Sequence, residues 1–588
     1  MHLSYSSSKY KDKTYKSYSI ATSYREGDTV RKKTLWPIGK LTDEQARQIR
    51  LICKVAKNTD EFFTNLKDIV VKETKAYLDI AMVNAIWNFW HLDNAFQLDI
   101  TESELSTPLI AKILTINRCV APCSHYSIPK WVKKVALRDI FNVDLCGIND
   151  DKIYYELDKI ERNKERIEEH LFHQTYTNNA NAYQYLNYDL STSYFIGHKC
   201  KLSAFGKGKA DCHGRRQVLL GVLINDEGYP FKWDVFTGNT AEVNTLEQNI
   251  NACRDRFKLT GSNVTMVFDR GIISKNNAEL VGLAKMKYIS ALDHNQIASC
   301  GFDLKAFKGL SVKQKTLHPK GFKRYDETLY FFDAGIITPK KRLVIGFNPA
   351  MFTTDRRNRS EKFQVLATYL KEQNIKLQNA KRDRSIKATN DRITQKIKRL
   401  KIKKYFYDPV LHPIKVKKKT KKGIKIVNSF KVEIKEKPEV VAAEKLLDGV
   451  CVFISNHVEQ QGRDFKIKAE QIIKAYREKT KVEDVFKNIK SFLKIRPFFV
   501  NTEIHVKAVY TICMLSYFIN RFLSNRRKEE CGKDYLNSKE LYAPFQDIDY
   551  VTLKDKASGQ IIKKSVELPK NTRRLLKQLK MEHIAFEQ

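Results

Sequence analysis

Four polar residues within the stretch 467–494 have a spacing that one continuous helix would gather on a narrow stripe: Tyr476, Lys479, Glu483 and Lys490. At 3.6 residues per turn, they fall within about 60° of one another. Apolar residues fall on the adjoining face, so we expect this helix to pack on a sheet, with Glu483 at the edge of the buried face. By itself, the pattern is also typical of an ordinary amphipathic helix with charge pairs one turn apart.

Two aspartates precede this helix in the chain. Asp189 lies in a strand-like stretch, and Asp269 ends the most apolar strand of the region, residues 264–268. A charge that ends a buried strand is costly unless it is paired or bound, and ligands of open α/β sheets collect at the carboxyl ends of strands. Carboxylate oxygens suit Mg²⁺, and two such ions can promote phosphoryl transfer. Either aspartate alone would more often be a turn or capping residue, but the three carboxylates together favour a metal-dependent site.

The elements around these carboxylates predict an α/β fold with a mixed sheet. Strands are expected at 188–195, 217–225 and 229–236 as an antiparallel meander, then a helix at 245–257, a strand at 264–269, a helix at 275–285 and a strand at 287–292. The alternation of strands and helices resumes with a strand at 448–455, which is followed by the helix at 467–494. Between them, the α/β pattern breaks, which indicates an insertion with β elements and a charged helical stretch over 360–404.

We expect six parts along the chain. They are a basic β-hairpin arm (1–40, with its strands within 16–36), a mostly helical N-terminal DNA-binding region (41–180, with helical periodicity over 42–98 and 130–172), the first part of the catalytic core (181–295), the insertion (296–445), the second part of the core with the glutamate helix (446–525) and a C-terminal tail (526–588). Seven lysines among residues 415–425 predict a solvated loop, with a DNA contact as the second interpretation.

The composition favours a nucleic-acid partner. The 106 Lys and Arg against 67 Asp and Glu give a net charge of +39, which suits a phosphate backbone, although a basic protein of another kind remains an alternative. The apolar run at 508–519 is too short for a membrane span and reads as a buried helix. Eleven scattered cysteines indicate a reducing compartment, so we expect a cytoplasmic protein without a membrane anchor.

Two short motifs resemble binding sites but lack residues that such sites require. Cys119, Cys123 and His125 lack a second ligand pair at zinc spacing, so we expect no zinc site there. The Gly/Lys loop at 206–209 is not a phosphate-binding P-loop, so we expect no nucleotide cofactor.

The segments around Asp189, Asp269 and Glu483 resemble those of the DDE transposases of bacterial insertion sequences. The resemblance is to the superfamily (insertion-sequence family four type) with the signature Tyr-(2)-Arg-(3)-Glu-(6)-Lys. In this chain the pattern consists of Tyr476, Lys479, Glu483 and Lys490, with lysine in place of arginine. The lysine keeps the positive charge but lacks the planar guanidinium group, which can bind a phosphate through two hydrogen bonds. Residues 188–195 with 214–246 resemble the first-aspartate region, and residues 267–274 resemble the second.

The resemblance implies a ribonuclease-H-like catalytic core and cut-and-paste movement of an element with terminal inverted repeats. Two Mg²⁺ or Mn²⁺ ions would be held by Asp189, Asp269 and Glu483. Phosphates of double-stranded DNA would be contacted by Tyr476, Lys479 and Lys490, and the enzyme would act as a homodimer on paired ends. Two alternatives stay open, namely a transposase-derived DNA-binding protein that no longer catalyses and a nuclease of the same fold that cuts without joining.

Overall fold

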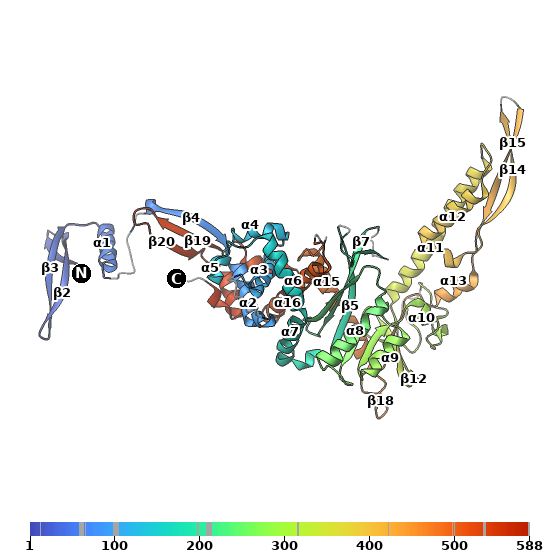
Figure 1. Ribbon diagram of the computed structural model, residues 1–588, viewed down its shortest axis with the longest axis horizontal. Coiled ribbons are helices and arrows are strands. Elements are labelled where there is room, and N and C mark those ends of the chain that lie inside the picture. The colour runs from blue at the N-terminus through green and yellow to red at the C-terminus, as the bar shows by residue number, and fades with distance from the viewer. Residues whose placement is uncertain are drawn as a thin grey trace. The chain divides into compact units, whose positions relative to one another are not determined.

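The computed structural model describes residues 1–585 except 12, 58–63, 65, 98–104, 197–198, 207–213, 314–316, 421–422, 497, 499 and 533–536. The chain divides into two compact units. Unit 1 comprises residues 1–82, 130–143 and 544–588, and unit 2 comprises residues 83–129 and 144–543. Figure 1 shows the elements of both units and labels many of them.

Unit 1 contains two antiparallel three-stranded sheets. One consists of β1 (His2–Tyr10), β2 (Lys13–Glu26) and β3 (Thr29–Gly39), followed by helix α1 (Asp43–Val55). The other has the order β20 (Ile561–Ser565), β19 (Asp549–Asp555), β4 (Ile69–Ala76), and helix α18 (Lys570–Gln578) follows it in the chain. Strands β2 and β3 form the predicted hairpin, whereas β1 was not predicted, because its serines and lysines show no apolar alternation. Strand β4 lies in a range predicted to be helical, and the strand that pairs with it lies at the far end of the chain.

Unit 2 is built on one large mixed sheet. Its strands are β5 (Tyr185–Tyr194), β6 (Ala204–Phe205), β7 (Arg216–Ile224), β8 (Pro230–Thr237), β9 (Thr265–Phe268), β10 (Lys287–Ala291), β11 (Lys323–Arg324), β12 (Tyr330–Thr338), β13 (Lys341–Phe347) and β16 (Val450–Ser455). The strands β8, β7, β5, β9 and β10 lie side by side in that order, with the first three antiparallel and the last three parallel. This is the ribonuclease-H-like arrangement, so the predicted fold class is confirmed. The sheet continues through β16 to β13, β12 and β11.

Helices cover both faces of this sheet. Helix α9 (Lys275–Leu283) packs on the face that carries Met266 and Phe268, and helix α14 (Ala469–Arg477) packs on the opposite face, which carries Val267. Further helices of unit 2 are α3 (Thr107–Val120), α6 (Asp150–Arg162), α7 (Lys164–Asn178), α8 (Leu246–Asn251) and α16 (Glu503–Cys531). The apolar run at 508–519 is a buried part of α16, as predicted. Among the described residues, no helix is long and apolar enough to cross a membrane.

The range predicted for the insertion has two structural parts. Its first part supplies β11, β12 and β13 to the main sheet. Its second part is an arm made of α11 (Pro349–Gln378), α12 (Ile386–Leu400), the two-stranded ribbon β14 (Val410–Thr420) and β15 (Gly423–Glu433), and α13 (Pro438–Lys445) (Figure 1). The lysines at 415, 417–419 and 425 lie in the paired strands of this ribbon, so the prediction of a loop was wrong for them, and residues 421–422 lie outside the described residues. Ribbon pairing was hidden because the charged residues alternate with only a few apolar ones.

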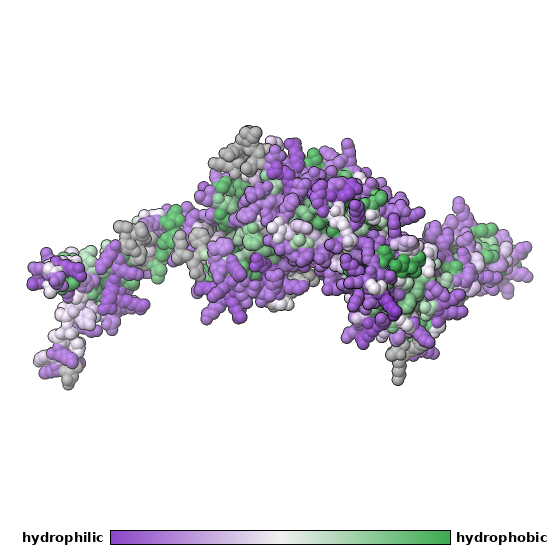
Figure 2. All heavy atoms as spheres, turned by 90° about the horizontal axis from the view of Figure 1, so that it is seen from below, coloured by the Kyte–Doolittle hydropathy of each residue, from purple (hydrophilic) through white to green (hydrophobic). Residues whose placement is uncertain are grey.

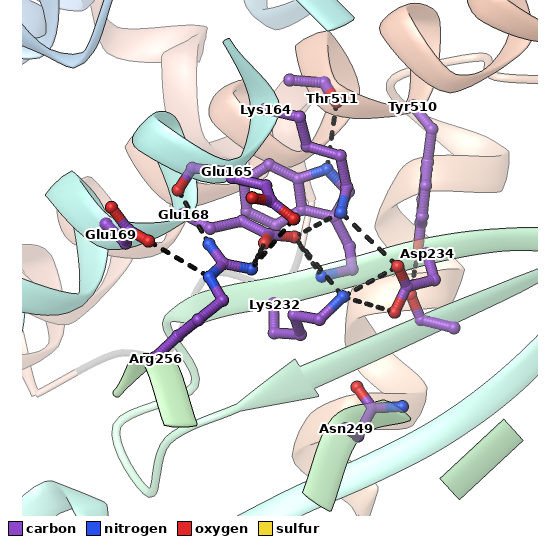
Figure 3. A network of polar contacts seen from close by, with 12 residues as sticks. Lys164, Glu165, Glu168, Glu169, Lys232, Asp234, Asn249, Arg256, Tyr510 and Thr511 are labelled. Atoms are coloured by element: carbon purple, nitrogen blue, oxygen red, sulfur yellow. Dashed lines mark hydrogen bonds and ion pairs between the residues drawn. The ribbon is translucent and has the colours of Figure 1, made fainter. Parts of the chain in front are cut away.

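A buried ionic network fastens α7 to strand β8 (Figure 3). The carboxylate of Glu168 is fully buried and lies 2.7 Å from the ammonium of Lys164 and 2.9 Å from the guanidinium of Arg256. Lys232 lies 3.9 Å from the same carboxylate and 2.7 Å from Asp234. Burial would raise the pKa of Glu168, but the surrounding cations hold it below its usual value. Each buried charge of this network is therefore compensated by an opposite charge close to it.

The same network reaches helix α16. The indole N–H of Trp233 on β8 donates to the hydroxyl of Thr511, 3.0 Å away. The hydroxyl of Tyr510 donates to the carbonyl oxygen of Gly221 on β7, 3.1 Å away. Helices α7 and α16 are thus both bonded to the meander that contains β5.

Glu161, at the end of α6, gives this region a pH-dependent stability. One of its carboxylate oxygens is buried without a hydrogen-bond partner, and burial raises the pKa of Glu161 from 4.5 to about 7. A raised folded-state pKa adds stability that is complete below the unfolded-state pKa and is lost as the pH rises through the folded-state value. We expect Glu161→Gln to stabilise the protein by about 1–3 kcal/mol near pH 8 and by much less near pH 5, measured by urea unfolding. A gain of equal size at both pH values would contradict this assignment.

Candidate active site

The two aspartates occupy neighbouring positions on adjacent strands. Strands β5 and β9 run parallel, and Tyr188 is paired with Phe268. Asp189 and Asp269 are the next residues on the two strands, so they lie side by side. Neighbouring strands lie about 4.8 Å apart. Because side chains alternate along a strand, both aspartates continue the face that carries Val267, which α14 covers. The fold therefore brings together two residues that lie far apart in the sequence.

The predicted single helix over 467–494 is two helices, which corrects the sequence analysis. Helix α14 ends at Arg477 and helix α15 (Thr480–Ser491) begins after Lys479. At the junction, the N–H of Val482 bonds to the carbonyl oxygen of Lys479 three residues earlier, so the regular helical pattern is interrupted. Glu483 lies in the first turn of α15, where the partial positive charge of a helix N-terminus favours a carboxylate.

Ionic contacts fix this junction on two sides. Arg477 bonds to the carboxylate of Asp326, in the loop before β12. Lys481 donates to the carbonyl and carboxylate oxygens of Asp226, in the turn between β7 and β8, at 2.7 and 2.8 Å. Both contacts come from distant parts of the chain, which explains why the local pattern did not predict the break.

Lys479 lies between two of the three carboxylates. Its ammonium is 3.3 Å from an oxygen of Asp269 and 3.6 Å from an oxygen of Glu483. The Lys479 side chain is only 9% exposed, whereas that of Glu483 is 59% exposed, so the carboxylate of Glu483 faces solvent at the edge of the site. Glu483 is therefore close to the site but has room to turn toward Asp269.

Tyr476 holds Asp269 from the other side. Its hydroxyl donates to Asp269 Oδ1, 3.2 Å away. Burial would raise the pKa of Asp269, but the Lys479 ammonium, the backbone N–H of Arg270 and the Tyr476 hydroxyl together hold it below its usual value. Burial and the negative charge of Asp269 raise the pKa of Tyr476, so the tyrosine stays protonated as a donor. Asp269 is thus an ionised carboxylate with a fixed orientation.

Lys490 reaches the strand that carries Asp189. It lies near the end of α15 and its ammonium bonds to the hydroxyl of Ser191. Ser191 is two residues beyond Asp189 on β5, so the two side chains share one face. All six residues singled out from the sequence, Asp189, Asp269, Tyr476, Lys479, Glu483 and Lys490, consequently lie on or over one face of β5 and β9.

The chemistry of the donor set fits a hard divalent cation, because three carboxylates supply only oxygen ligands. Among the described residues, however, no three His, Cys, Asp or Glu side chains are close enough together to hold a metal ion as they stand. Glu483 is the ligand that would have to turn inward, since it now pairs with Lys479.

Four residues that support the site were missed by sequence reasoning: Ser191, Asp226, Asp326 and Lys481. Asp226 lies in a turn that the sequence does predict, but nothing local indicates its contact with α15. Residues 207–209 of the Gly/Lys loop lie outside the described residues.

Two family models match the chain. A model of the IS1634 family transposase N-terminal domain matches residues 3–62, and a model of the transposase DDE domain matches residues 197–519. The second match spans more than half of the 588 residues. Asp269 and Glu483 lie inside it, and Asp189 lies just before its start. No curated protein sequence matches the chain.

Three solved structures are distantly similar. The piggyBac transposase synaptic complex with hairpin DNA is 9% identical, with 87% of this chain and 83% of that chain covered and a TM-score of 0.34. A pre-cleavage Mos1 transpososome is 10% identical, with 30% and 58% covered and a TM-score of 0.14. A Mos1 transposase paired-end complex with the left transposon end is 11% identical, with 42% and 72% covered and a TM-score of 0.14.

Proposed function

Since the chain belongs to the DDE transposases, enzymes that cleave DNA and transfer its strands, we propose that Asp189, Asp269 and Glu483 are its catalytic carboxylates. The observation that supports this most is the position of Lys479, whose ammonium lies within 3.6 Å of oxygens of both Asp269 and Glu483. A cationic group thus already lies between two of the carboxylates. The third, Asp189, is adjacent across the β5–β9 pair.

We further propose that the three carboxylates hold two Mg²⁺ ions, for which Mn²⁺ can substitute. Bound ions would supply Lewis-acid activation of the attacking oxygen and stabilisation of the leaving oxygen. The protein's own residues prepare the site. Tyr476 orients Asp269 by a hydrogen bond, and the buried Lys479 balances the charge of two carboxylates. Tyr476, Lys479 and Lys490 are proposed to face the DNA backbone near the cleaved strand.

In the proposed reaction, hydrolysis at the ends of the mobile element frees 3′-hydroxyl groups, and these attack target DNA. The substrate is double-stranded DNA with terminal inverted repeats, and a homodimer holds the paired ends. The protein is proposed to act in the cytoplasm, on the DNA of the nucleoid.

A strand-transfer assay tests this function. A labelled duplex that ends in the inverted repeat flanking the gene is incubated with the full chain, Mg²⁺ and a target plasmid. We expect cleavage at the repeat and labelled strands joined to the plasmid, both lost in EDTA. Binding without cleavage would identify a non-catalytic DNA-binding derivative. Cleavage without joined product would identify a nuclease of this fold.

Lys490 gives a prediction about DNA affinity. If its ammonium neutralises one phosphate, Lys490→Ala is expected to weaken duplex binding several-fold and to lower the slope of log affinity against log salt by about 0.9. The measurement is a salt titration of binding in EDTA. Lys487→Ala is the matched control, because Lys487 is exposed on the same helix. Equal slopes for both variants and the unaltered protein would contradict the proposed role.

A further inference from the structure

The arm that follows β13 contains a large share of the chain's positive charge. Residues 349–445 have 28 Lys and Arg against 10 Asp and Glu, a net +18 out of +39 for the whole chain. None of the proposed catalytic carboxylates lies in this range. The active site therefore does not account for the charge.

The arm also has its own hydrophobic core, separate from the core of the sheet. This core consists of Leu366, Leu377, Ile393, Ile397, Ile402, Tyr405, Phe406, Val432 and Val441. Helix α11 has 30 residues, so it is about 45 Å long. Figure 2 shows that the surface of the arm, at the right of that view, is mostly hydrophilic. The arm is thus a self-supporting structure that displays basic residues.

The ribbon β14–β15 is fastened to the arm's helices through one of its faces. Val427 is fully buried, and the hydroxyl of Ser429 donates to the carbonyl oxygen of Leu377 on α11, 2.6 Å away. The N–H of Asn428 donates to the carboxylate of Asp383, 2.7 Å away. These contacts fix the orientation of the ribbon, so its other face has a defined direction.

That other face combines lysines with exposed isoleucines. Lys417 pairs with Ile426 and Lys419 pairs with Ile424 across the ribbon, and Lys415 continues the same face. The three lysines are exposed, and the isoleucines are 68% (Ile424) and 55% (Ile426) exposed. Two large exposed apolar side chains beside three lysines give this face both positive charge and apolar contact area, a combination found at interaction sites.

From this face, we propose that the ribbon β14–β15 is a second DNA-binding element, which enters a groove of duplex DNA outside the active site. The major groove admits a two-stranded β-ribbon. Alternate residues on a strand lie about 7 Å apart, so Lys415, Lys417 and Lys419 can reach separate phosphates. Ile424 and Ile426 lie opposite Lys419 and Lys417 on the neighbouring strand and contact base edges, where apolar side chains pack on thymine methyl groups.

The first test measures duplex binding by the full chain in EDTA, so that the result does not depend on the carboxylates. The triple variant Lys415→Ala, Lys417→Ala, Lys419→Ala is expected to lower the salt slope by about 2–3, roughly 0.9 for each phosphate lost. The control is Lys403→Ala, Lys435→Ala, Lys445→Ala, which removes three exposed lysines from the arm outside the ribbon face. It should change the slope by less than about one. Equal slopes for the two triple variants would overturn the proposal.

The second test separates apolar contact from charge. The double variant Ile424→Ser, Ile426→Ser is expected to bind duplex DNA about tenfold more weakly with an unchanged salt slope. Both side chains are exposed, so the thermal unfolding midpoint should not change. Full duplex affinity in this variant would overturn the groove contact. If the lysine variant lost binding to phosphatidylglycerol vesicles but kept full duplex affinity, the partner would be a membrane surface and the proposal would be wrong.

Discussion

Asp189→Asn, Asp269→Asn and Glu483→Gln are each expected to lower DNA cleavage by about three orders of magnitude or more. The substitutions keep the size of the side chain and remove its charge, and metal-ion catalysis of this kind supplies several kcal/mol of transition-state stabilisation. The measurement is the single-turnover rate of cleavage of an element end in saturating Mg²⁺. Binding of uncleaved duplex in EDTA should stay equal or become slightly tighter, because one negative charge facing the phosphates is removed.

Glu470→Gln is the matched control for these variants. Glu470 lies in the first turn of α14 and is exposed, so its loss should leave the cleavage rate unchanged. If Glu483→Gln cleaved DNA as fast as Glu470→Gln, the third carboxylate would have to be another residue. If a variant lost duplex binding together with cleavage, the substitution would have disturbed the fold rather than the chemistry.

Glu168→Gln should produce the largest loss of stability, about 3–5 kcal/mol, because it leaves Lys164, Lys232 and Arg256 inside the protein with too little negative charge. Its carboxylate also accepts the N–H of Trp233, 3.0 Å away, and glutamine leaves a single oxygen as acceptor for this N–H and the surrounding cations. The pKa of Glu168 is depressed in the folded state. The stability it contributes is therefore present above its unfolded-state pKa and lost as the pH falls through the folded-state value.

The measurement is thermal unfolding near neutral pH, where the midpoint should fall by on the order of 10 °C. Glu165→Gln on the same helix is the control. Glu165 is 75% exposed and lies 3.9 Å from Arg256, so its loss should cost less than about 1 kcal/mol. Similar midpoints for the two variants would mean that Asp234 and Glu169 neutralise the cations without Glu168.

Much of the catalytic core was predictable, because its signals are local. The strands β5, β7, β8, β9, β10 and β16 are marked by apolar runs between turns, and each was predicted to within a few residues. The position of Asp269 at the end of a buried strand and the spacing from Tyr476 to Lys490 were equally visible. Burial and helical periodicity depend on the types of residues that are close together in the sequence, so a sequence pattern can predict them.

Other features depend on partners far along the chain. Strand β4 forms because β19 lies beside it, and the ribbon β14–β15 forms although its strands contain many lysines. The break between α14 and α15 is fixed by Asp326 and Asp226, which bond to Arg477 and Lys481. No local propensity reveals such contacts, since tertiary contacts outweigh the small differences in propensity between residues.

The sequence by itself determined the order and type of the core elements, the charge of the protein and six candidate site residues. Only the tertiary structure decided that Lys479 lies between Asp269 and Glu483, that Lys490 reaches β5, and that the lysine-rich stretch becomes an oriented ribbon. The physical reason is that residue types and local periods fix which surfaces must be buried. The pairing of those surfaces, and thus every distance between charges in the site, depends on packing between segments that are remote in the chain.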